Sequence, residues 1–81
     1  MDILMTDDLK MKLMECNNHC IRKIANNCRN DNLSPYMSRN TLYYLKKDFN
    51  EYKNELDDEE AKALSNDLNV IEDYMIRNDR W

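Results

Sequence analysis

The sequence predicts an all-α fold: a small three-helix bundle in which a first helix packs on an antiparallel hairpin formed by the second and third helices. Two apolar stripes with the alternating three- and four-residue spacing of a helix flank one acidic segment, residues 55–60. The chain of 81 residues also contains no glycine, and its length fits a single helical domain over residues 1–81. The first stripe is Leu42, Leu45, Phe49, Tyr52 and Leu56, and the second is Ala61, Leu64, Leu68, Ile71 and Met75.

The first helix is expected over about residues 6–29, with Thr6 as its N-cap. At about 100° per residue, its apolar side chains form two adjoining rows, so we expect this helix to contact two neighbours. One row is Leu9, Leu13, Cys16, Cys20 and Ile24, and the other is Met14, Ile21, Ala25 and Cys28. The three cysteines are therefore expected in the core. At the end of the helix, an asparagine is expected in the left-handed conformation, because no glycine is available.

Residues 30–38 are predicted to be a linker, in which Ser34 and Pro35 fit the start of a short separate turn. The second helix is expected over about residues 39–55 and the third over about residues 58–78. Asp57 is a suitable N-cap for the third helix, with Glu60 three residues later as in a capping box. The short connection makes these helices an antiparallel hairpin. Because a chain of this length buries little surface, a dimer formed through the same apolar faces is an open alternative.

Composition and charge narrow the class of function. No apolar run approaches the roughly 20 residues needed to cross a bilayer, and the first residues lack the features of a secretory signal. An odd number of cysteines, three, favours reduced thiols and a cytoplasmic location. Twelve asparagines, against nine Gly, Ala, Pro and Arg residues together, are typical of an AT-rich gene. Such genes are found in many phages, large DNA viruses and low-GC bacteria. We expect a phage- or virus-encoded protein as one of these alternatives, and a cytoplasmic location, which is the host cytoplasm if the protein is viral.

The charge is unevenly distributed along the chain. Residues 1–54 carry a net charge of +2 and residues 55–81 a net charge of −6. The acidic third argues against nucleic-acid binding, which needs clustered Lys and Arg, and it would suit docking on a basic protein surface. The alternative is that these acids form a solvated face that complements the dipole of the helix. We expect a protein partner, no nucleic acid and no membrane.

Cys16, His19, Cys20 and Cys28 are residue types that bind zinc, but their spacing does not favour a site. Cys28 lies about 12 Å along the helix from Cys20, and His19 projects about 100° away from Cys20. His19 has no convergent partners for acid–base catalysis, and a phosphate-binding glycine loop cannot form without glycine. We therefore expect no metal, no cofactor, no small-molecule substrate and no enzymatic activity.

Tyr43 and Tyr44 project more than 100° away from the apolar stripe of the second helix. They lie either at an interface with a partner or beneath the first helix, and Val70 and Tyr74 on the third helix present the same two alternatives. The predicted partner-binding residues are Tyr36, Met37, Tyr43 and Tyr44, with Glu59, Asp67 and Asp73 as an acidic patch. These predict a small interaction module that regulates or inhibits a larger host or viral protein. The alternative is a self-associating structural or assembly subunit.

The segment Ser65-Asn66-Asp67-Leu68-Asn69 resembles the S-Q-E-L-D signature of the Spo0E-like aspartyl-phosphate phosphatases. The resemblance covers at most residues 41–76. In that family a two-helix hairpin docks on a response regulator, and the last Asp of the signature is needed for activity. Here Asn69 occupies that position. The resemblance therefore implies a hairpin that binds a response regulator but lacks the key Asp.

Overall fold

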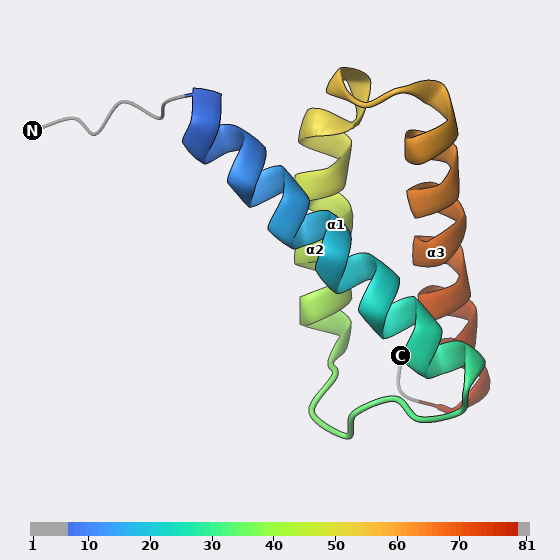
Figure 1. Cartoon of the computed structure of the whole chain (residues 1–81). Coiled ribbons are helices and arrows are strands. Elements are labelled where there is room, and N and C mark those ends of the chain that lie inside the picture. The colour runs from blue at the N-terminus through green and yellow to red at the C-terminus, as the bar shows by residue number, and fades with distance from the viewer. Residues whose placement is uncertain (1–6, 80–81) are drawn as a thin grey trace, which may run out of the picture.

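The structure is a computed structural model that describes residues 7–79, and every regular element in this range is a helix. The elements are α1 (Asp7–Arg29), α2 (Arg39–Tyr52), the short 3-10 helix η1 (Lys53–Glu55) and α3 (Asp58–Arg77). In Figure 1, α2 and α3 lie side by side and run in opposite directions, and α1 crosses this hairpin diagonally on one side. The predicted three-helix fold is confirmed. Thr6, the predicted N-cap of the first helix, lies outside the described residues.

The core lies where the three helices face one another. In α2 and α3 the core consists of residues that the two apolar stripes predicted. Leu56 and Ala61, at the end of the hairpin, are only half-buried. The buried stripe residues are Leu42, Leu45, Phe49, Tyr52, Leu64, Leu68, Ile71 and Met75. Helix α1 adds Ile21, Ala25 and Cys28. The molecule measures 43 × 32 × 16 Å along its principal axes, and 16 Å is the thickness expected of two helical layers. One layer is the hairpin and the other is α1.

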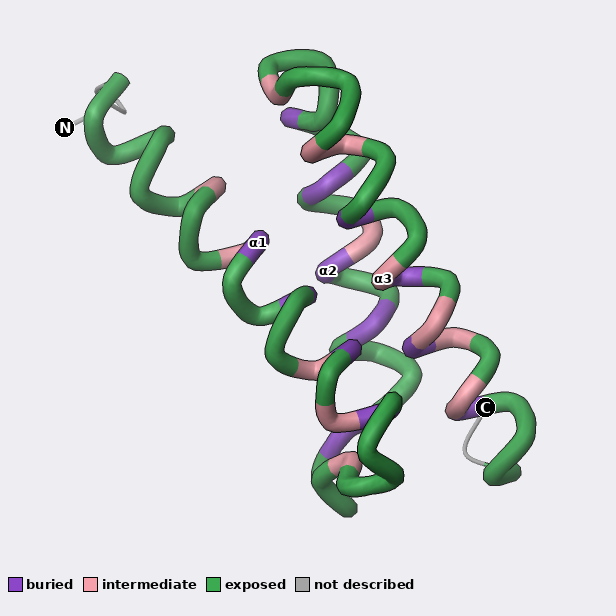
Figure 2. The backbone as a smooth tube through the Cα atoms, turned by 45° about the vertical axis from the view of Figure 1, so that its right-hand side comes forward, coloured by how far each residue is buried: buried purple, intermediate pink, exposed green. Residues whose placement is uncertain are grey.

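Helix α1 contacts both α2 and α3, as predicted, but only one of its two apolar rows is largely buried. Ile21, Ala25 and Cys28 are buried, whereas the side chains of Cys16 and Cys20 are exposed. The expectation that all three cysteines lie in the core is therefore right for Cys28 alone. The reason is the crossing angle: the N-terminal half of α1 extends away from the hairpin, and Figure 2 shows that half as mostly exposed.

Side chains cap the two helices of the hairpin at their N-termini. The predicted cap of α3 is confirmed, since Asp57 Oδ1 accepts from the backbone N–H of Glu60 at 2.7 Å. The carboxylate of Glu60 does not complete the capping box but pairs with Arg22 of α1 at 2.8 Å. Helix α2 begins after Ser38, whose Oγ accepts from the backbone N–H of Thr41.

Helix α1 ends in a Schellman motif built on an aspartate rather than on an asparagine. Asp31 has a φ of 53°, and the backbone N–H groups of Asp31 and Asn32 donate to the carbonyls of Cys28 and Asn27. The carboxylate of Asp31 accepts from the Tyr74 hydroxyl at 2.6 Å. Half-buried Tyr74 and Val70 thus pack beside the end of α1, in favour of the internal alternative for these two residues.

Ion pairs join the elements at their edges. Within residues 7–79 there are four of them, and each connects two different elements. The pairs are Lys10–Glu55, Arg22–Glu60, Arg29–Asp67 and Lys46–Glu72. Because most of these side chains are partly exposed, each pair contributes only about 0–1 kcal/mol. Three of them join α1 to the hairpin, and Lys46–Glu72 joins the two arms of the hairpin.

Candidate functional site

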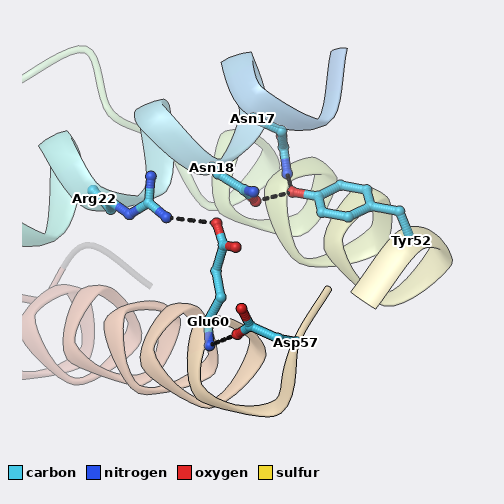
Figure 3. A network of polar contacts seen from close by, with 6 residues as sticks. All are labelled: Asn17, Asn18, Arg22, Tyr52, Asp57 and Glu60. Atoms are coloured by element: carbon cyan, nitrogen blue, oxygen red, sulfur yellow. Dashed lines mark hydrogen bonds and ion pairs between the residues drawn. The ribbon is translucent and has the colours of Figure 1, made fainter. Parts of the chain in front are cut away.

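A polar network inside the core fixes the position of α1 on α2 (Figure 3). The side-chain amide of Asn17 donates to the Tyr52 hydroxyl at 2.8 Å, and that hydroxyl donates to Asn18 Oδ1 at 2.5 Å. Asn17 also donates to the carbonyl of Leu45 at 3.4 Å. Asn18 is only 3% exposed, so these bonds satisfy polar atoms that water does not reach. We call this network, formed by Asn17, Asn18 and Tyr52, an interhelical lock, because its hydrogen bonds hold α1 and α2 in one relative position.

The apolar pattern of the sequence did not predict this network. Asn18 lies four residues after Met14 and three before Ile21, so it occupies the buried row of α1. That spacing was the signal, but a pattern of apolar residues alone does not place a polar residue such as Asn18 in the core. Burial raises the pKa of the Tyr52 phenol, an effect that the hydrogen bond from Asn17 opposes and the carboxylate of Asp48 reinforces. Tyr52 therefore remains a neutral hydroxyl that both donates and accepts.

Tyr43 and Tyr44 form an exposed aromatic pair on the outer side of α2. Their side chains are 59% and 60% exposed, so they do not lie beneath α1. The two rings meet edge to face with centroids 5.4 Å apart. They line a shallow cleft whose polar residues include Arg39, Lys47 and Glu51. Of the two alternatives for this pair, the structure favours the exposed one. We call Tyr43 and Tyr44 the tyrosine pair.

The two predicted partner-binding residues that precede α2 differ in their exposure to solvent. Tyr36 is 92% exposed, whereas Met37 is buried in the core. Residues 34–37 form a turn in which the backbone N–H of Met37 donates to the carbonyl of Ser34 at 3.1 Å. This turn directs Met37 inward and Tyr36 outward. Met37 therefore offers little surface to a partner in this structure, and its role in partner binding stays a prediction.

The three acids predicted as a steering patch do not lie together. Glu59 and Asp73 are exposed on α3, but fourteen residues separate them, which is roughly 21 Å along a helix. Asp67 lies at the contact between α3 and α1, where its carboxylate pairs with Arg29 at 2.6 Å. Because Asp67 pairs with Arg29 and the other two acids lie far apart, the three do not form one patch, and their role in steering a partner stays a prediction.

The thiols and the histidine do not converge on one point. Among residues 7–79, no group of three or more His, Cys, Asp or Glu side chains is placed to hold a metal ion. Cys16 and Cys20 line an apolar groove between α1 and α2, and His19 is exposed. In the same range, no helix combines the length and apolar character that crossing a membrane requires.

No protein-family model, curated protein or solved structure matches this chain. The segment that resembles the phosphatase signature lies in α3. Leu68 in this segment is buried in the core, and Asn69, at the position of the required Asp, is exposed. In this chain α1 covers one side of the hairpin that carries the segment (Figure 1).

Proposed function

We propose that this protein is a non-enzymatic protein-binding module, a regulator or inhibitor of phage or viral origin that acts in the host cytoplasm. The observation that supports the proposal is the tyrosine pair on the outer side of α2. Tyrosines present a large, rigid contact area at low cost in conformational entropy, and they are enriched among the residues that dominate binding energy. An exposed pair held edge to face on a rigid helix is a preformed anchor.

The partner surface is expected to combine an apolar pocket with polar groups of both signs. The cleft beside the tyrosine pair carries Arg39 and Lys47 as cations and Glu51 as an anion. Mixed charges at the rim of an interface fix orientation and exclude wrong partners more than they increase affinity. Tyr36, at the turn before α2, is a further exposed aromatic side chain. The binding energy is therefore assigned to the tyrosines and the selectivity to the charged rim.

Capture from a lysate of the native host, followed by measurement of affinity for each captured protein, tests this proposal. The variant Tyr43→Ala/Tyr44→Ala should weaken binding of the cognate partner by more than tenfold, with an unchanged far-UV circular dichroism spectrum. Ile76→Ala is the matched control, because Ile76 is an exposed apolar residue on α3 that lies outside the cleft. If the double variant and the control bind every captured protein as tightly as the parent chain, the tyrosine pair is not the anchor.

A further inference from the structure

A second exposed apolar surface lies on α1, away from the tyrosine pair. Leu13, Cys16 and Cys20 follow one another at the spacing of a helical row, and Leu9 extends that row toward the N-terminus. All four side chains are exposed, and Leu13 is 51% exposed. We call these four residues the α1 row. Contiguous apolar surface on a small protein is a common mark of an interaction site.

The α1 row forms one wall of a groove. The groove has a volume of about 650 Å³ and lies between the N-terminal half of α1 and the C-terminal part of α2. Its floor and walls include Leu13, Met14 and Cys20 from α1, and Tyr52 from α2. The diagonal course of α1 opens this groove, since α1 and α2 diverge toward the N-terminus (Figures 1 and 2). An apolar side chain from outside would fill it.

The two borders of this face carry opposite charges. Asp48 and Glu51 of α2 line the far side of the groove, and the charge of Lys10, which also lines it, is balanced by its ion pair with Glu55. On the other side of the α1 row, Lys12 and Lys23 project within about 80° of its centre at 100° per residue. Within residues 7–79 none of these four border residues takes part in an ion pair, although four other ion pairs link the elements. Across this face, four features therefore follow one another: the basic border with Lys12 and Lys23, the α1 row, the groove, and the acidic border with Asp48 and Glu51.

Such a face is complementary to itself under one particular symmetry. A two-fold axis that runs along α1 places the basic border of one copy opposite the acidic border of the other. An axis that runs across α1 would instead place like charges opposite each other. We propose that a second copy of this chain covers this face, with the two α1 helices parallel and the α1 row of each copy filling the groove of the other. This homodimer leaves the tyrosine pair outside the interface, although Glu51 lines both the cleft beside that pair and the groove.

Analytical ultracentrifugation of the full chain over a range of concentrations tests the proposal. The parent chain should show a monomer–dimer equilibrium, and Leu13→Glu should weaken dimerisation by more than tenfold. Ile76→Glu is the matched control, because Ile76 has the same exposed fraction as Leu13, 51%, on α3. The control should dimerise like the parent chain. A parent chain that stays monomeric throughout, or two variants that weaken the dimer equally, would overturn the proposal.

Charge exchange and cross-linking test the orientation. Lys12→Asp and Asp48→Lys should each weaken the dimer, and the two changes together should restore it, because the pair then meets with reversed signs. In a variant that keeps Cys20 as its only cysteine, a short bismaleimide should join two chains, since equivalent residues of parallel helices face each other across the axis. A dimer in which the combined charge variant stays weak, or in which Cys20 fails to cross-link, excludes the parallel arrangement.

Discussion

Replacing Tyr52 by phenylalanine should destabilise the fold by about 2 kcal/mol, because it leaves a buried acceptor without its donor. The ring and its edge-to-face contact with Phe49, with centroids 5.9 Å apart, remain. What disappears is the hydroxyl that accepts from Asn17 and donates to Asn18 Oδ1. Asn17 keeps the carbonyl of Leu45 as an acceptor, but Asn18 is 3% exposed, and water cannot replace the lost donor. An unsatisfied buried polar group costs about 1–3 kcal/mol.

Urea unfolding followed by circular dichroism gives the free energy of unfolding for each variant. Asn18→Leu, which is close in size to the parent residue, completes a double-mutant cycle with Tyr52→Phe. Because the double variant has neither the orphaned acceptor nor its donor, it should be less destabilised than the sum of the two single changes, by about 1 kcal/mol. Strict additivity, or a loss below about 0.5 kcal/mol for Tyr52→Phe, would refute the assignment of the network as a lock.

The variant Tyr52→Phe should also remove a pH dependence of the free energy of unfolding. Burial raises the pKa of Tyr52 above its ordinary value of 10.0, so the folded state holds the phenolic proton more tightly than the unfolded state does. The resulting stabilisation is complete below pH 10.0 and is lost as the pH rises through the pKa of the folded state. Between these two pKa values, the advantage of the parent chain over Tyr52→Phe should shrink by up to about 1.4 kcal/mol per pH unit. A difference that does not change with pH would contradict this account.

Three further predictions concern single positions in the core and at the helix ends. Leu64→Ala should lower the free energy of unfolding by about 2–5 kcal/mol, measured by urea titration, because Leu64 is fully buried and leaves a cavity. Asp57→Ala should lower the free energy of unfolding by about 1 kcal/mol through loss of the α3 cap, whereas Asp58→Ala, in the first turn, should cost less; equal losses would count against the cap. Asp31→Ala should be less stable than Asp31→Gly by about 1 kcal/mol, because both lose the bond from Tyr74 and only alanine resists a φ of 53°. Matching melting temperatures for the two Asp31 variants would refute that explanation.

The hairpin was predictable because its residues are locally consistent. The main apolar stripe of α2 and that of α3 each follow one side of their helix, and the cap at Asp57 fixes where α3 begins. Each helix can bury such a narrow stripe only against a neighbour, and the short connection makes that neighbour the other arm of the hairpin. Leu42 and Leu64 are therefore buried as expected.

The ambiguous positions lie on surfaces where the pattern offers more than one solution. The apolar arc of α1 is wide enough for two contacts, and only the crossing angle decides that Asn18 is buried while Cys16 is exposed. In the same way, the turn before α2 decides that Met37 points inward, and the approach of Arg29 decides that Asp67 faces α1. The residues within one helical turn do not determine any of these outcomes, because each depends on where another part of the chain lies.

The amino-acid sequence by itself thus determined the three helices, the arms of the hairpin and the faces that they bury against each other. The tertiary structure decided which row of α1 stays exposed, how the Asn17–Asn18–Tyr52 network closes, and that the tyrosine pair points outward. The physical reason is that helical periodicity specifies directions around one axis, whereas burial depends on where the other axes cross it.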